Sequence, residues 1–123
     1  MERQEMGVML DPAVVEGFIK RSVAVHLLPG EFAFTVNLGG IMSFYIDRLG
    51  IPPVATSWDE IREMLDIAVK RAKTTKPAEP ANLPFNVRLI GGGVPVWLCL
   101  KVYSVLVYQC DAIFFVGDSV IKL

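Results

Sequence analysis

The stretch "VPVWLCLKVYSVLVYQCDAIFFVG", which runs from Val94 to Gly117, is long, apolar and rich in β-branched residues. A membrane helix needs about 20 predominantly apolar residues, so the stretch has the length to cross a bilayer. It nevertheless contains Lys101 and Asp111, and a lysine near the bilayer centre costs about 3 kcal/mol on insertion scales. The valines and tyrosines that recur along it favour strands. We therefore expect β-strands here and no membrane segment.

As strands, the stretch divides at residues 109–111 into a hairpin of Trp97–Tyr108 with Ala112–Val116. Both faces of the first strand are apolar, which is typical of a strand at the centre of a sheet covered on both sides. Two helices can cover one face, so the other face is predicted to be an interface with another molecule. The candidate interface residues are Trp97, Cys99, Lys101, Tyr103, Val105, Val107 and Phe114.

The chain before this stretch begins its regular structure at Asp11-Pro12, where Asp suits an N-cap and Pro the first helical position. Apolar residues then recur at helical spacing from Val14 to Leu27. Pro29-Gly30 is expected to end this first helix.

Residues 31–46 are predicted to form two strands. Phe32, Phe34 and Val36 alternate with smaller or polar residues, which is the pattern of a half-buried strand. Gly39-Gly40 suits a hairpin turn, after which "IMSFYI" resumes as the second strand.

A second helix follows residues 57–60, "SWDE", which form a capping box. Its apolar stripe consists of Trp58, Ile61, Leu65, Ala68 and Ala72, with Met64 beside it. Residues 74–84 carry three prolines and are predicted to be a mobile connection. Phe85 to Ile90 is a short strand, and residues 91–93, three glycines, turn the chain into the long apolar stretch.

The predicted fold is therefore a single α+β domain over residues 1–123, with a flexible tail at 1–10. We expect an antiparallel sheet of about five strands with two helices packed on one face, in the order α-β-β-α-β-β-β. A chain of this length can bury one core.

The composition is apolar for a globular chain. Hydrophobic residues make up 53%, charged residues 20%, and the mean hydropathy is +0.47. We therefore expect part of the surface to be buried in a homo-oligomer or against a protein partner. The net charge of -1 and the lack of a large basic cluster argue against nucleic acid as a partner. The polar N-terminus has no secretory signal, which favours a cytoplasmic location.

No residue pattern points to catalysis. The three glycines at 91–93 match neither phosphate-binding pattern. His26, Cys99 and Cys110 make a poor metal set, and both cysteines suit packing in a core. Lys101, between apolar neighbours, is expected to reach solvent or a carboxylate rather than act as a nucleophile. We therefore assign no catalytic residue, no metal and no cofactor.

Two segments resemble the U-type gas-vesicle accessory proteins. "FAFTVNLGGIMSFYI", residues 32–46, is similar to that family's early hairpin. A late tryptophan followed by an aromatic segment matches at Trp97, Asp111, Phe114, Phe115 and Gly117, although the arginine-glycine that follows the family's tryptophan is absent here. The resemblance implies a non-catalytic cytoplasmic accessory protein that works through protein–protein contacts. The predicted order of elements is also similar to that of roadblock-type dimerisation domains.

The sequence thus favours an interaction protein that self-associates or binds a protein partner through an apolar sheet face. The alternative is a small-molecule binding or catalytic domain with a pocket between helix and sheet. Such a pocket needs convergent polar groups, for which Lys101, Tyr103 and Asn37 are the candidates.

Overall fold

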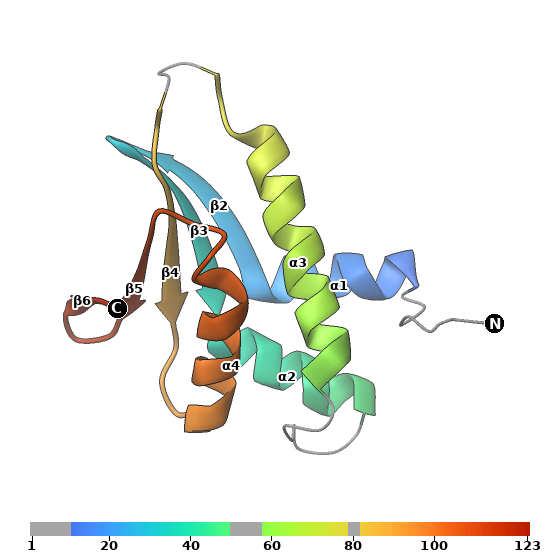
Figure 1. Ribbon diagram of the computed structural model, residues 1–123. Coiled ribbons are helices and arrows are strands. Elements are labelled where there is room, and N and C mark those ends of the chain that lie inside the picture. The colour runs from blue at the N-terminus through green and yellow to red at the C-terminus, as the bar shows by residue number, and fades with distance from the viewer. Residues whose placement is uncertain (1–10, 50–57, 79–81) are drawn as a thin grey trace.

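The computed structural model describes residues 11–49, 58–78 and 82–123. These residues form four helices and five strands, which confirms the α+β class and the strand number (Figure 1). In chain order the elements are α1 (Pro12–Ser22), β2 (Val23–Leu28), β3 (Glu31–Asn37), α2 (Leu38–Leu49), α3 (Trp58–Thr75), β4 (Phe85–Ile90), α4 (Val96–Leu106), β5 (Ala112–Val116) and β6 (Val120–Lys122). The predicted order and the predicted number of two helices are wrong.

The sheet is mixed, not antiparallel as predicted. Its strand order is β2-β3-β4-β5-β6. The central pairs β3–β4 and β4–β5 are parallel, whereas the edge strands β2 and β6 pair antiparallel with their neighbours. Parallel neighbours require a crossover connection of a dozen or more residues, usually a helix. The two helices that the sequence analysis missed, α2 and α4, lie in these crossovers.

The long apolar stretch forms α4 followed by β5, so the predicted hairpin of Trp97–Tyr108 with Ala112–Val116 is wrong in its first strand. Leu98, Val102 and Leu106 recur every four residues, and all three are buried against the core. The strand preference of valine mainly reflects how well it packs on a half-buried surface, so packing can override it. Here the parallel β4–β5 pair needs a crossover, and α4 supplies it.

The segment after β3 is also a helix, not the predicted second strand. Gly39 and Gly40 lie in the first turn of α2 rather than in a hairpin turn. The Asn37 side chain accepts a hydrogen bond from the Gly40 N–H at 3.0 Å, which is the geometry of an N-cap. Ile41 and Tyr45, one helical turn apart, are both buried.

The first predicted helix is correct at its start but too long. The Asp11 side chain accepts a hydrogen bond from the Ala13 N–H at 2.8 Å, as an N-cap does, and α1 ends at Ser22. The next six residues form β2, and Pro29-Gly30 is the turn of a β2–β3 hairpin rather than a helix stop. Gly30 adopts a φ of 81°, which a type II turn requires after proline.

Several local predictions are confirmed. The buried stripe of α3 contains all the predicted residues, together with Val69. The strand at Phe85–Ile90 is β4, and β3 buries the predicted alternating residues. The predicted connection at 74–84 is corrected at its start, because Thr74 and Thr75 belong to α3. Residues 1–10, Ser57 of the capping box and residues 79–81 lie outside the described residues.

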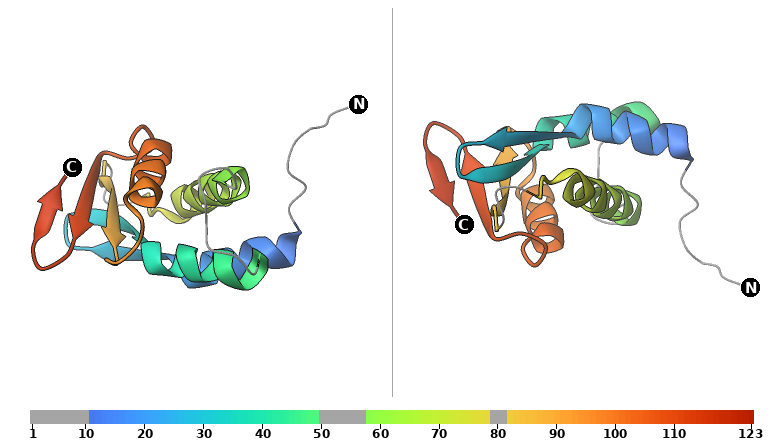
Figure 2. Two further views of the ribbon diagram at one scale, coloured as in Figure 1. Left: turned by 90° about the horizontal axis from the view of Figure 1, so that it is seen from below. Right: turned by 90° about the horizontal axis from the view of Figure 1, so that it is seen from above.

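The helices gather on one side of the sheet (Figure 2). Phe34, Val36, Val87 and Leu89 face them and are fully buried. The opposite face carries Glu31, Thr35, Arg88 and Phe114, which are only partly buried, and no helix of the described residues covers it. None of the helices in the described part of the chain combines the length and apolar character that a membrane span requires.

Candidate protein-interaction site

The outer edge of β2 is a sheet edge that the fold leaves open to another chain. β2 is an edge strand of six residues that pairs with β3 along its whole length. Among the described residues, no strand pairs with its other side. The turn at Pro29-Gly30 carries the end of the hairpin away from α1 and α2 (Figure 1). An edge of this kind presents unpaired N–H and C=O groups to any strand that approaches.

Apolar side chains lie along this edge and are exposed. Val25 is 41% exposed, Leu27 60% and Leu28 37%. Val25 and Leu27 project on the helix side of the sheet, since their partners Phe34 and Phe32 belong to the core. Both side chains therefore stay in contact with water.

The β2 edge also lacks the features that usually prevent edge strands from pairing. Native edges carry charges, especially lysine, or proline, or are very short. The strand "VAVHLL" contains no Lys, Arg, Asp, Glu or Pro. The opposite edge, β6, has only three residues and includes Lys122. The two edges therefore differ, and β2 is the one suited to pair with another chain.

The face of the sheet away from the helices is closed over by its own polar groups. The Glu31 carboxylate accepts hydrogen bonds from the Arg88 guanidinium at 2.6 and 3.1 Å and from Asn86 at 3.2 Å. The guanidinium also lies over the Phe114 ring, 5.6 Å from its centroid. These contacts join β3, β4 and β5, and they place Phe114, a predicted interface residue, beneath a charge rather than on an open apolar face.

The other predicted interface residues lie on or next to α4, so they do not share a sheet face. Lys101 and Val105 line a polar groove between α3 and α4. Apolar members of the set pack partly against the core rather than project from a strand: Trp97, Cys99, Tyr103, Val105 and Val107. The prediction that they form one exposed apolar face of a sheet is therefore wrong.

Both cysteines are free and partly buried. Burial raises the pKa of the Cys99 thiol. It also raises the pKa of Cys110, an effect that the negative charge of Asp111 strengthens and the positive charge of Lys73 opposes. Only the thiolate is a nucleophile, so neither site favours a reactive cysteine. No cluster of three or more His, Cys, Asp or Glu side chains suitable for a metal occurs in the described residues.

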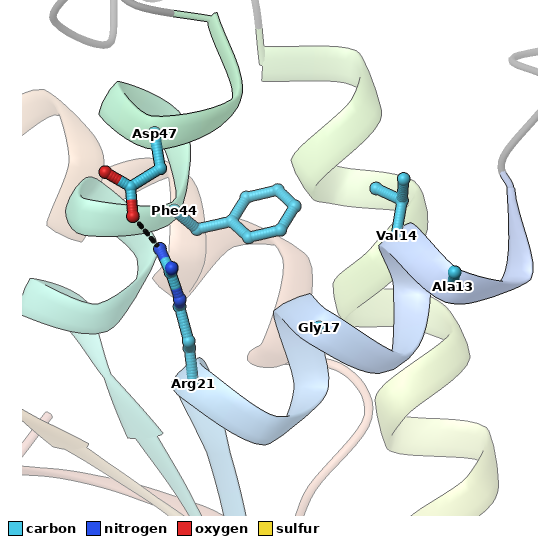
Figure 3. A pocket seen from close by; sticks show the side chains of 6 residues that line it. All are labelled: Ala13, Val14, Gly17, Arg21, Phe44 and Asp47. Carbon is cyan, nitrogen blue, oxygen red and sulfur yellow. Dashed lines mark ion pairs between the residues drawn. The ribbon is translucent and has the colours of Figure 1, made fainter.

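A cleft of about 290 Å³ lies between α1 and α2 (Figure 3). Ala13, Val14, Gly17 and Phe44 give it apolar walls. At its rim Arg21 points towards Asp47, and the two form an ion pair at 2.6 Å. The two charges at this rim therefore compensate each other.

The three polar candidates for a ligand pocket have separate roles. Asn37 caps α2, Lys101 lines the α3–α4 groove, and Tyr103 packs against the core. None of the hollows described above is lined by more than one of them. The three candidates therefore do not converge on one pocket.

The sequence analysis missed the residues of the β2 edge because it placed them in a helix. A signal was present. Val23–Leu28 and Glu31–Asn37 are two runs of strand-forming residues separated by a two-residue Pro-Gly turn, which is a hairpin pattern.

Comparisons with known proteins add no assignment to this geometry. The chain matches no protein-family model, and searches of curated proteins and of solved structures returned no match.

Proposed function

We propose that this chain is a protein-interaction domain that self-associates by pairing the edge of β2 with a strand of another copy. The observation that supports this most directly is the exposure of Val25 and Leu27 on an unprotected six-residue edge. Strand addition of this kind draws affinity from main-chain hydrogen bonds and specificity from alternate side chains.

The energy available at Leu27 is large enough to measure. Burying a leucine side chain completely contributes about 1.5–3 kcal/mol. Since 60% of Leu27 is exposed, burial of this exposed part would contribute about 1–2 kcal/mol for each copy. If both copies bury it, the contribution is about 2–4 kcal/mol, which corresponds to a change of about 30-fold or more in the dissociation constant.

The test uses two leucines of matched exposure. Leu27 on β2 is 60% exposed and Leu100 on α4 is 62% exposed. The variants Leu27→Lys and Leu100→Lys therefore make the same chemical change on two surfaces, only one of which is the proposed interface. Size-exclusion chromatography with light scattering, at several protein concentrations, measures the molar mass of each variant and of the wild type.

We expect the wild type and Leu100→Lys to have the same mass at each concentration. The dissociation constant of Leu27→Lys should be at least about 30-fold higher than that of the wild type. Circular dichroism checks that both variants remain folded. A wild type that is monomeric throughout, or a Leu27→Lys variant that associates as the wild type does, would contradict the proposal.

The resemblance to the U-type gas-vesicle accessory proteins suggests one setting for such a domain, since it implies a role through protein–protein contacts. This role stays a prediction, and the β2 edge is the surface on which it can be tested. Binding to a candidate partner protein should be lost in Leu27→Lys and kept in Leu100→Lys.

A further inference from the structure

The backbone of β2 shows which groups are available for pairing. The Phe32 N–H donates to the Pro84 carbonyl at 2.8 Å, so the backbone of Phe32 is directed towards β4 and away from β2. Hydrogen-bonded and non-hydrogen-bonded pairs alternate along an antiparallel ladder. Leu27, the partner of Phe32, therefore directs its own N–H and C=O outwards, and so does Val25. At Val23 only the C=O is available, because the Val23 N–H donates to the Ile19 carbonyl at the end of α1.

From this arrangement we infer that the partner strand is β2 of a second copy, antiparallel, on a two-fold axis that passes through Val25. The inference rests on the proposed function and names the strand and the register. Val25 then lies opposite Val25 of the other copy, and Val23 lies opposite Leu27 in both directions. Two five-stranded sheets join into one continuous sheet, and the dimer is closed.

This register pairs both outward-facing groups of Val25, the N–H of Leu27 and the C=O of Val23. The Val25 pair exchanges two hydrogen bonds. Each Val23–Leu27 pair forms one, from the Leu27 N–H to the Val23 C=O, because the Val23 N–H is already bonded to Ile19. A register shifted to centre on His26 would place Val23 opposite Pro29, which has no N–H to donate. It would also place the two His26 side chains directly opposite each other, whereas the first register places each His26 opposite Ala24.

The two-fold symmetry also determines which side chains of the two copies can lie opposite each other. A two-fold axis perpendicular to a sheet keeps each face on its own side, so residues that oppose each other must come from the same face. Val23, Val25 and Leu27 share the helix side, since their β3 partners are core residues. Apolar residues therefore meet apolar residues across the axis, and Ala24 meets His26 on the other face.

Pairing of β2 with β6 of a second copy is the main rival. It is a head-to-tail contact, which leaves one edge unused at each end and continues into a filament. β6 offers three residues rather than six, one of them Lys122. Pairing of β2 with itself uses the longer edge on both sides and ends at two copies.

Cross-linking through single cysteines tests the register. Cys99→Ser and Cys110→Ser remove the native thiols, and Val25→Cys or His26→Cys is then added singly. In the proposed register the Cα atoms of the two copies of residue 25 are about 5.5 Å apart, within disulfide range. The two copies of residue 26 are offset along the strands by more than about 7 Å, which is out of range.

We expect mild oxidation to convert Val25→Cys to a covalent species of twice the 13.6 kDa monomer mass, and to leave His26→Cys uncrosslinked. The double variant Ala24→Cys/His26→Cys should also cross-link, which provides a second test if Val25→Cys folds poorly. Ile121→Lys on β6 should keep the mass of the wild type.

The outcomes separate this inference from the proposed function. Cross-linking of His26→Cys alone would overturn the register while β2 self-association stands. Loss of association in both Ile121→Lys and Leu27→Lys would indicate β2–β6 pairing and overturn the two-fold arrangement. A monomeric wild type would contradict the proposed function itself.

Discussion

Two glycines in neighbouring helices should respond in opposite directions to the same substitution. Gly17 lies in the interior of α1, and a Cβ added there would meet nothing within 4 Å. Gly40 lies in the first turn of α2, and a Cβ added there would lie 2.5 Å from the backbone carbonyl oxygen of Arg21. The pair therefore tests how α1 and α2 pack, and whether the segment after β3 is a helix at all.

The magnitudes follow from propensity and packing. Alanine is favoured over glycine in a helix interior by about 1 kcal/mol, so Gly17→Ala should stabilise the fold by about that amount. At Gly40 real Cβ contacts essentially never fall below 3.0 Å, so α1 and α2 would have to separate by at least about 0.5 Å. Overpacking of this kind costs about 1–3 kcal/mol, and a propensity gain of up to about 1 kcal/mol offsets it only in part.

We expect urea denaturation, followed by circular dichroism at one fixed protein concentration, to place Gly17→Ala above the wild type and Gly40→Ala about 1–2 kcal/mol below it. In thermal unfolding the same differences correspond to about 4 °C for each kcal/mol in a chain of this size. If Gly40→Ala were as stable as the wild type, or Gly17→Ala less stable, the packing of α1 on α2 described here would be wrong.

Two further predictions concern the sheet and the thiols. Glu31→Gln should destabilise the fold by about 1–3 kcal/mol, because Arg88 loses the charge that pairs with it on a partly buried face. Arg88→Gln should cost much less stability in the Glu31→Gln background than in the wild type. Strictly additive effects in this double-mutant cycle would show that the pair is not coupled. Cys99 and Cys110 should react with a thiol reagent at least about 10-fold more slowly in the native protein than in denaturant at pH 8, because burial raises the pKa of each thiol and lowers the thiolate fraction. Fast labelling of either cysteine in the native protein would contradict this and indicate a reactive thiol.

The elements that the sequence predicted correctly are those with strong local signals. Asp11 and Pro12 mark a helix start by their own side chains, and α3 has an amphipathic stripe over eighteen residues. β4 is bounded by Pro84 and by the glycines that follow it. In each case the interactions that define the element lie within a few residues, so tertiary context does not need to be known.

The elements that it predicted incorrectly depend on distant contacts. The residues of α4 have strand propensities, but Leu98, Val102 and Leu106 bury a helical stripe because β4 and β5 are parallel and require a crossover. Gly40 is weak in a helix by propensity, yet the close approach of Arg21 leaves no room for a larger residue. Neither contact is visible in a single sequence.

The candidate site was missed for a related reason. The sequence predicts a sheet with one apolar face open to a partner, and most of the residues it assigns to that face lie on α4. The structure exposes Val25 and Leu27 on β2, whereas the sequence pattern places them in the last turns of a helix. An error in one element type therefore moved the expected interface from the edge of the sheet to one of its faces.

The native mass of the wild-type protein tests the self-association of this domain most directly. Sedimentation equilibrium from about 1 µM to about 100 µM covers the range of dissociation constants expected for such a contact. We expect a dimer of twice the 13.6 kDa monomer mass, which dissociates on dilution and does not grow into larger species. A folded monomer at every concentration would contradict it.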